Sequence, residues 1–444
     1  MKAKKVLSLV LAASMMAGML IGCGSNGSNT SSGSNASSDS NTSSDSQGSD
    51  DTDAAQETGG GSGEILLWSS ATGPDGEAIK ATIDKYNATN PAFTVKFVTM
   101  EAATFNTKLT TAGKSGKGVP DLALVASESL PTYYSQGMIE SWDDAIAGTE
   151  VKGENYISGA WDAGTIDGSQ WGVPATMGSW IMYVNKDLAE KYVPGCLDDG
   201  FITYEEIEQA GDAAKADGNY AAATTWNMQN YMNIYQQMGG TWLDGDGKIS
   251  VNNEYSLNAL NEYKMLNEKG WLVPQGEDAG KLFLNGKVVF LPEGTWMLST
   301  MQEITEFEWV ETFTPQWDLN NIVQCAGADQ FTMFKSAEER SSAKLAGMVE
   351  FLTWLQGNQL DWCKSGAIPS GIAMSQNEEF LALPQSFLIT SETGRDKVRI
   401  NTVEGTDHVF SEVDGRMWDM ISGSADIAAT FDEIQKIVNE KMGY

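Results

Sequence analysis

The sequence predicts an α/β protein that follows an export segment and a polar linker. From residue 64 onward, short aliphatic or β-branched runs alternate with amphipathic segments, which is typical of α/β architecture. The chain has 444 residues, enough for two lobes of ordinary domain size. The first 63 residues have a different composition and are expected to lie outside the folded part.

Residues 1–22 are predicted to be a lipoprotein signal peptide. Three lysines among the first five residues precede a mostly apolar run over residues 6–21, the order that export signals have. The run ends in Leu-Ile-Gly-Cys at residues 20–23, which resembles a bacterial lipobox. We therefore expect a lipid on Cys23 that holds the protein at the extracytoplasmic face of the cell membrane. The alternative is an ordinary secretory peptide.

Residues 23–63 are predicted to be the lipidated cysteine and a disordered linker. Residues 24–63 are rich in Ser, Gly and Asn and contain no Lys, Arg, aromatic residue, Val, Ile, Leu or Met. Such a segment has nothing to bury in a core. A flexible chain of about 40 residues spans roughly 35 Å, so the sequence describes a globule on a tether.

The folded part is predicted to open with a strand-helix-strand unit. Residues 65–68 and 94–98 are candidate strands, and residues 77–90 between them place apolar side chains at helical spacing. A third candidate strand covers residues 122–125. Further along, three Ser/Thr-x-x-Glu patterns predict helix starts with capping boxes. These patterns are Thr203 with Glu206, Ser336 with Glu339, and Thr430 with Glu433.

Polar loops follow the three candidate strands. Ligands bind beyond the carboxyl ends of strands in open α/β sheets, so Asp75, Glu101 and Glu128 are candidate site residues. For Asp75, capping the following helix is an equal alternative. For Glu128, the place after a strand end favours a site role over a solvated surface position. The loops lack a Gly-rich phosphate fingerprint, which argues against nucleotide binding.

Several of the fourteen tryptophans stand in loop contexts. They are Trp68, Trp226, Trp242 and Trp296. A sugar ring has an apolar C-H face and a rim of hydroxyls, so a sugar site needs flat aromatic surfaces edged by amides and carboxylates. Trp296, which follows Gly294 and an apolar strand, fits this role best, and Trp68 and Trp242 are further candidate ligand-binding residues. For any single tryptophan, a place in the core is the ordinary alternative.

Composition excludes several function classes. The net charge of −32 argues against nucleic-acid binding through a basic face. A single histidine, His408, has no recognisable serine or cysteine partner motif, so we expect no nucleophilic catalysis. The aspartates from 244 to 246 resemble a calcium loop at first, but Lys248 and Ile249 break the required pattern, and a Gly-rich hairpin is expected. The four cysteines are too scattered for a zinc site or a disulfide framework, and at least one of the three after Cys23 should be free. No cofactor or metal is expected.

Four segments, in order, resemble the family 1 extracellular solute-binding proteins of bacterial ABC importers, the class that includes maltose-binding protein. Val-Pro-Asp-Leu at residues 119–122 is followed by an apolar turn at 133–139. Trp-Gly-Val-Pro at 171–174 leads to Tyr-Val-Asn-Lys-Asp-Leu at 183–188. Phe-Leu-Asn-Gly-Lys at 283–287 leads to Gly-Thr-Trp at 294–296, and Gly-Ala-Ile-Pro stands at 366–369. The resemblance covers nearly all of residues 64–444.

The resemblance implies a two-lobe, class II periplasmic-binding fold with a hinge and a ligand cleft between the lobes. The first lobe would comprise residues 64–176 and 326–376, and the second residues 177–325 and 377–444. The protein would be a monomeric, non-enzymatic component that passes a carbohydrate to a permease driven by a separate ATPase. By alignment, the resemblance places Trp296, Glu128, Asn227 and Gln229 in the cleft, with Asp75 and Glu101 in ligand-side loops, whereas Asp121 would be structural.

Two departures and three rival functions qualify this interpretation. Ser129 stands where the maltose type has a basic residue, and Gly178 where it has an acid, which argues against a maltodextrin ligand. The rivals are a secreted glycoside hydrolase, which needs two suitably spaced carboxyl groups, a binding protein for a cationic or peptide solute, and a tethered sensor.

Overall fold

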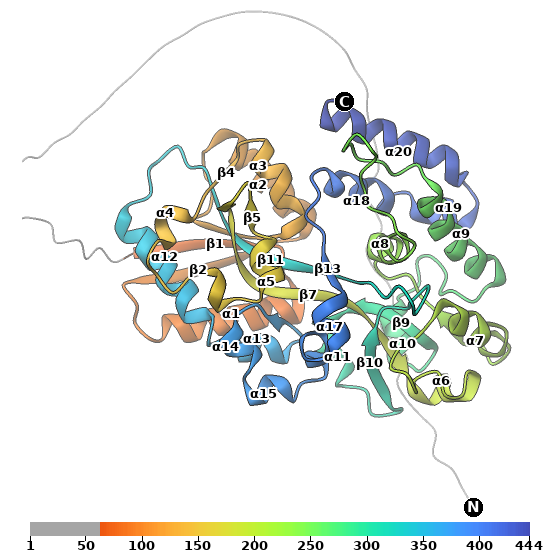
Figure 1. Cartoon of the computed structure of the whole chain (residues 1–444). Helices are drawn as coiled ribbons and strands as arrows, with labels where there is room; N and C mark the ends of the chain where they lie inside the picture. Colours follow the sequence, from red (N-terminus) through yellow and green to blue (C-terminus); the bar gives the residue numbers. More distant parts are fainter. Residues whose placement is uncertain (1–62) are drawn as a thin grey trace, which may run out of the picture. The chain divides into compact units, whose positions relative to one another are not determined.

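The computed structural model describes residues 63–444 (Figure 1). The predicted signal peptide, the lipidation of Cys23 and nearly all of the predicted linker therefore lie outside the described residues. Within residues 63–444, no helix combines the length and the apolar character that a bilayer crossing requires.

One mixed sheet organises the described residues, in the strand order β2-β1-β3-β11-β7-β9-β8. Its strands are β1 (Gly63–Ser69), β2 (Phe93–Thr99), β3 (Leu122–Ala126), β7 (Gly172–Asn185), β8 (Tyr220–Ala222), β9 (Val288–Gly294) and β11 (Gln324–Phe334). Short strands join it at the sides, namely β4 (Ile139–Glu140), β10 (Trp309–Phe313), β12 (Ile368–Pro369) and β13 (Val398–Ile400). A separate hairpin pairs β5 (Thr165–Ile166) with β6 (Ser169–Gln170).

Helices pack around both ends of this sheet. Before β7 they are α1 (Gly73–Asn87), α2 (Ala102–Ser115), α3 (Leu130–Ser135), α4 (Asp143–Ile146) and α5 (Ser158–Asp162). Between β7 and β11 they are α6 (Lys186–Tyr192), α7 (Tyr204–Ala216), α8 (Asn227–Gln237), α9 (Glu254–Lys269), α10 (Ala279–Leu284) and α11 (Leu298–Met301). After β11 they are α12 (Ser342–Leu355), α13 (Leu360–Lys364), α14 (Ile372–Ser375), α15 (Glu378–Leu381), α16 (Phe387–Thr390), α17 (Glu392–Lys397), α18 (Thr406–Asp414), α19 (Met417–Ser422) and α20 (Ile427–Met442).

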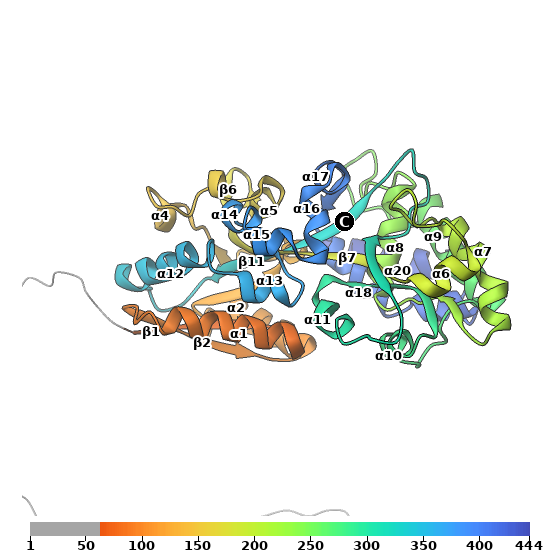
Figure 2. The same ribbon diagram turned by 90° about the horizontal axis from the view of Figure 1, so that it is seen from below.

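The two largest of the four core clusters lie in different halves of the sheet, in agreement with the predicted two-lobe α/β fold. We call the part around Ile65, Ile83 and Phe351 the first lobe, and the part around Tyr231 and Phe431 the second lobe. Figure 2 shows α1 and α12 at one end of the sheet and α7 and α9 at the other. The lobe boundaries expected from the sequence stay a prediction.

Two long antiparallel strands, β7 and β11, connect the lobes. β11 pairs with β3 of the first lobe, and β7 pairs with β9 of the second. Between these partners, β7 and β11 pair with each other from Gly172 to Ser179. Residues on this shared segment therefore face groups from both lobes.

The predicted strand-helix-strand unit is present, with β1 parallel to β2. Its helix, α1, begins at Gly73 rather than near residue 77, because Pro74 occupies a first-turn position that needs no backbone N–H donor. Asp121 is structural, as expected: its carboxylate accepts a hydrogen bond from the Leu66 amide at 2.8 Å and lies 2.9 Å from the Lys344 ammonium.

Of the three predicted capping boxes, one is confirmed and two are wrong. Thr203 and Glu206 exchange both capping hydrogen bonds at the start of α7. Ser336 instead lies in a turn before α12, which Ser341 caps. Thr430 lies inside α20, whose cap is Asp426. The same three-residue spacing also occurs within helices and turns, so the pattern alone does not locate a helix start.

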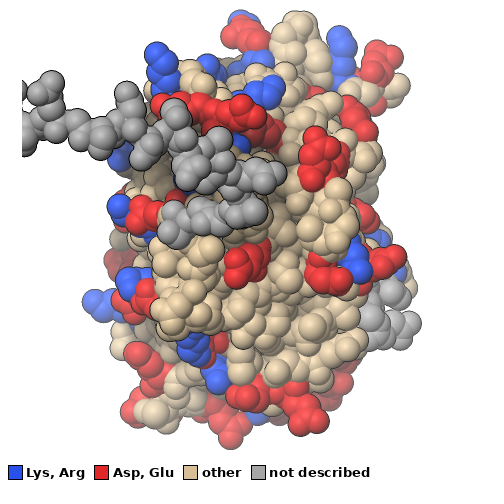
Figure 3. Space-filling view, turned by 90° about the vertical axis from the view of Figure 1, so that its left-hand side faces the viewer, with Lys and Arg blue, Asp and Glu red and all other residues tan. Residues whose placement is uncertain are grey.

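The hairpin predicted from residue 242 onward is confirmed. Leu243 and Ile249 form an antiparallel bridge, and the Asp244 carboxylate accepts hydrogen bonds from the amides of Asp246 and Lys248. Among residues 63–444, no group of three or more His, Cys, Asp or Glu side chains is arranged to hold a metal ion. On the face shown in Figure 3, Lys and Arg stand scattered among Asp and Glu.

Candidate functional site

Trp296 lies at the centre of a cluster of three tryptophans. It follows β9 in a single 3-10 turn, Thr295–Met297, and its side chain is half-buried. The ring of Trp180 lies 5.8 Å away at 88°, and the ring of Trp226 lies 5.4 Å away at 86°. Both neighbours meet Trp296 edge to face, the arrangement that aromatic quadrupoles favour. We call these three residues the tryptophan cluster.

Glycines allow this cluster to sit against the backbone. A Cβ on Gly294 would lie 2.1 Å from the Trp296 ring, and a Cβ on Gly366, where φ is +117°, would lie 1.7 Å from the Thr295 carbonyl oxygen. Neither position accepts a side chain without displacing the loop that holds Trp296. The glycines of the Gly-x-Trp and Gly-x-Ile-Pro segments are thus required by close contact.

A second pair of glycines forms the floor beneath the cluster. Gly178 of β7 and Gly327 of β11 stand opposite each other in the strand register. A Cβ on Gly178 would lie 3.7 Å from the Trp296 ring, and a Cβ on Gly327 would lie 3.3 Å from Oε1 of Glu128 and 3.8 Å from the Trp180 ring. The floor therefore connects the tryptophan cluster to an acidic group from the first lobe.

That acidic group contains Glu128, Asp329 and Asp75. Glu128, in the turn Ser127–Ser129 after β3, is 9% exposed, and burial raises its pKa to about 7. Burial also raises the pKa of Asp329 to about 7, and the negative charges of Asp75 and Glu128 add to the effect. Burial raises the pKa of Asp75, whose carboxylate accepts a hydrogen bond from the Trp362 indole at 2.7 Å. Asp75 and Glu128 are thus each close enough to Asp329 for their negative charges to repel its own.

Glu293 supplies a fourth carboxyl group, from the second lobe. It is 7% exposed and accepts hydrogen bonds from the Gly294 amide at 2.9 Å and from the indole N–H of Trp226. Burial raises its pKa to about 7. No ion pair among the described residues includes any of these four carboxyl groups.

The structure brings together three residues predicted from the sequence, namely Trp296, Glu128 and Asp75. Asn227 is the first residue of α8, directly after Trp226, and its buried Oδ1 has no hydrogen-bond partner within residues 63–444. Gln229 is half-buried in the first turn of the same helix. Asp75 is not a helix cap, because it lies within the first turn of α1.

The other three predicted residues stand apart from this group. Trp68 packs against the small core cluster that contains Leu109 and Val125, and Glu101 is exposed at the start of α2. Trp242 requires a correction: it is 2% exposed and stacks on Tyr235 at 4.2 Å, inside the second-lobe core. Since it offers no surface to a ligand, the prediction that Trp242 binds ligand is wrong.

Sequence reasoning missed Trp180, Glu293 and Asp329 as site residues. Side chains two residues apart on a strand share a face. Trp180 therefore lies on the same face of β7 as Gly178, and Asp329 on the same face of β11 as Gly327, which is the face of the glycine floor. That inference needs the pairing of β7 with β11, which the local sequence does not show. Glu293 immediately precedes the Gly-Thr-Trp segment and could have been noticed there.

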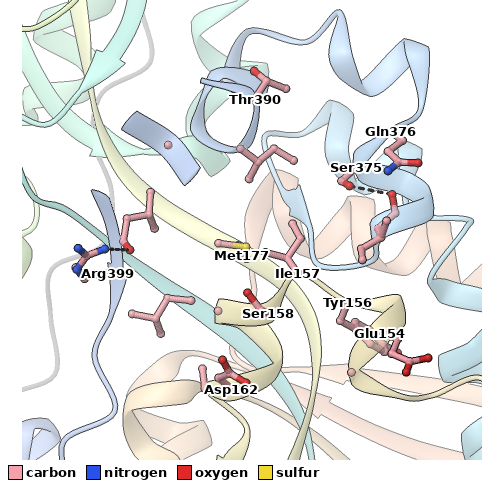
Figure 4. Close-up of a pocket in the computed structure, with 18 of the residues that line it drawn as sticks. Glu154, Tyr156, Ile157, Ser158, Asp162, Met177, Ser375, Gln376, Thr390 and Arg399 are labelled. Carbon is pink, nitrogen blue, oxygen red and sulfur yellow. Dashed lines mark hydrogen bonds between the residues drawn. The ribbon is translucent and has the colours of Figure 1, made fainter. Parts of the chain in front are cut away.

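A separate cavity lies on the other face of β7 (Figure 4). Its volume is about 1120 Å³, and Met177 lines it together with Ile157, Ser158 and residues of α14 and β13. Because Met177 and Gly178 point to opposite faces of the strand, this cavity does not include the tryptophan cluster. The only aromatic residue among its described lining residues is Tyr156, which is 3% exposed, so it has no aromatic platform for a sugar.

Sequence comparison identifies the family. The model of the bacterial extracellular solute-binding proteins matches residues 81–387. The chain belongs to this family. Two arabinooligosaccharide-binding proteins are similar to it, one from Halalkalibacterium halodurans with 23% identity over 212 residues, 45% of each chain, and one from Bacillus subtilis with 22% identity over 165 residues. The second match covers 36% of this chain and 37% of the relative, so each match spans less than half of the relative's length.

Solved structures show the same fold. An ABC substrate-binding protein of Listeria monocytogenes in complex with cycloalternan has a TM-score of 0.73 at 18% identity, covering 86% of this chain and all of that one. The GacH receptor of Streptomyces glaucescens, solved unliganded and with acarbose, has a TM-score of 0.72 at 16% identity, covering 85% of this chain and 98% of that one. At these identities the likeness establishes the fold alone.

Proposed function

We propose that this protein captures a carbohydrate outside the membrane and delivers it, chemically unchanged, to the permease of an ABC importer. The observation that carries the proposal is the tryptophan cluster, which stands over the glycine floor between buried carboxyl groups of the two lobes. Indole faces match the apolar face of a sugar ring, and carboxyl oxygens accept hydrogen bonds from its hydroxyls. The relatives are named as binding proteins for arabinooligosaccharides, which supports this ligand class.

Ligand contact with both lobes would favour a closed arrangement about β7 and β11. The first lobe contributes Glu128, Asp75 and Asp329, and the second contributes Trp296 and Glu293. A ligand that touches both sets stabilises the state in which the sets are close, and the permease would recognise that state. A lipid on Cys23 would keep the protein beside its permease, and a separate ATPase would supply the energy.

Binding of a saccharide panel to wild type and Trp296→Ala tests the proposal. We expect saturable binding of at least one mono- or oligosaccharide, and recovery of the same sugar unchanged by chromatography. Trp296→Ala should weaken that binding at least tenfold, about 1.4 kcal/mol, while the melting temperature of the unliganded protein stays nearly unchanged, because Trp296 is half-buried and belongs to none of the core clusters.

Trp354→Ala is the matched control. Trp354 is also half-buried, but it packs against Tyr86 and the first-lobe core, so its loss should lower stability and leave sugar affinity unchanged. Release of shorter sugars would support a hydrolase instead. If Trp296→Ala lowers the free energy of unfolding by as much as it lowers the free energy of sugar binding, Trp296 belongs to the core, and the proposal loses its basis.

A further inference from the structure

We infer that the ligand site continues along the second lobe into a pocket for one additional sugar ring, between Thr224 and Trp418. We call this the side pocket. The inference rests on the proposed function and specifies its substrate class: a saccharide of at least two linked rings rather than a monosaccharide.

The order of strands places the side pocket next to the tryptophan cluster. β8 is parallel to β9, and Leu272 pairs in parallel with Ala222 on the far side of β8. The carboxyl ends of parallel strands meet at one edge of a sheet. The loops that follow these three segments therefore lie along a single edge, in the order Trp296, residues 223–226, and residues 273–277.

The side pocket opens where the last two of these loops meet. It has a volume of about 160 Å³. At about 30 Å³ for each water in the liquid, this volume equals about five waters, which suits one small ring and not a longer chain. Its lining comprises residues 224–225, 273–277, Ala279 and Trp418. Trp226 directly follows the lining residues Thr224 and Thr225, so the tryptophan cluster and the side pocket share one loop.

Thr224 provides the sharpest sign that the side pocket holds a polar ligand. Its side chain is 8% exposed, and its hydroxyl has no hydrogen-bond partner within residues 63–444. Buried hydroxyls in folded proteins nearly always have a partner. The neighbouring Thr225 hydroxyl, in contrast, donates to the carbonyl oxygen of Pro292. A sugar hydroxyl in the side pocket would supply the partner that Thr224 lacks.

The other lining groups match the same ligand. Trp418, from α19, packs partly against the second-lobe core and remains half-buried, so it adds an aromatic surface to the side pocket. Gln275 and Glu277 are exposed at its rim and bring an amide and a carboxylate. Aromatic surface, hydroxyl, amide and carboxylate together form the set of groups that a sugar ring requires.

Affinity as a function of ring number tests the inference. The probes are two matched series, arabinose, arabinobiose and arabinotriose, and glucose, maltose and maltotriose, measured by calorimetry with the full mature chain. In the series that binds, we expect wild type to bind the disaccharide at least tenfold more tightly than the monosaccharide. Thr224→Val and Trp418→Ala should each remove most of that gain while changing monosaccharide affinity less than twofold.

Two controls separate the side pocket from general damage. Thr224→Ser keeps the hydroxyl and should retain the disaccharide gain. Trp354→Ala, in the first lobe, should also retain it. The inference is refuted if wild type shows no disaccharide gain, or if Thr224→Val and Trp418→Ala both keep the wild-type ratio of the two affinities, as they would if the side pocket held only water. If no saccharide binds wild type, the proposed function itself fails, and the inference with it.

Discussion

Glu128 should make the unliganded protein less stable at neutral pH than at mildly acidic pH. The pKa of a glutamate is ordinarily 4.5, and burial raises that of Glu128 to about 7. Between these two values the folded protein keeps a proton that the unfolded chain releases. The stability contributed by this group is therefore fully present below about pH 4.5 and is lost as the pH rises to about 7. From pH 5 to pH 7 the loss is about 2 kcal/mol, because some of the unfolded chains are still protonated at pH 5 and half of the folded molecules still hold the proton at pH 7.

Urea unfolding of wild type and Glu128→Gln at pH 5 and pH 8 measures this loss. Glutamine is neutral at both values, so the variant lacks the pH-dependent penalty. We expect its advantage in free energy of unfolding to grow by about 2.5 kcal/mol between pH 5 and pH 8, while its affinity for the sugar falls. Glu433→Gln, on the exposed side of α20, should show no such growth. Growth of less than about 1 kcal/mol would refute the reasoning that Glu128 is a buried, unpaired acid kept for ligand binding.

Two further substitutions test the geometry of the site and the core. A Cβ on Gly178 makes only an ordinary 3.7 Å contact with Trp296, so Gly178→Ala should fold normally. Gly178→Leu should fill the space above the glycine floor and weaken sugar binding at least tenfold in a titration. Unchanged affinity in the leucine variant would show that the ligand does not lie there. Trp242→Ala should lower the free energy of unfolding in urea by about 3 to 5 kcal/mol without changing sugar affinity, because Trp242 is buried against Tyr235. Trp226→Ala should cost far less stability, because the Trp226 side chain is 41% exposed. Similar costs for the two variants would contradict this placement.

Structural features that depend on residues close together in the sequence could be predicted from it. The alternation of β1, α1 and β2 follows from local periodicity, and the capping box at Thr203 depends on residues three apart. The polar residues after strands, Asp75 and Glu128, follow from the rule that ligands bind at carboxyl ends. The same local reasoning failed at Ser336, where the helix begins only after Ser341.

The rest of the site depends on strand pairing between segments far apart in sequence. Gly178 and Gly327 are opposite each other only because β7 and β11 pair in one particular register. That register also sets which residues of these strands face the tryptophans, and it is fixed by the packing of both lobes. Trp242 and Trp296 both stand near glycines in the sequence, and only the tertiary contacts separate a core indole from one in a site.

The three cysteines of the described residues, Cys196, Cys325 and Cys363, are buried and form no disulfide. Burial raises the pKa of Cys196 to about 11 and that of Cys363 to about 12, and it raises the pKa of Cys325 further. The thiolate is the form that reacts with thiol reagents, so these buried side chains should not react with maleimide dyes in the native protein. Cysteines introduced on the outer surfaces of α1 and α20 would then accept a fluorophore pair without background from these three, and the energy transfer between the dyes would report the approach of the two lobes as sugar is added.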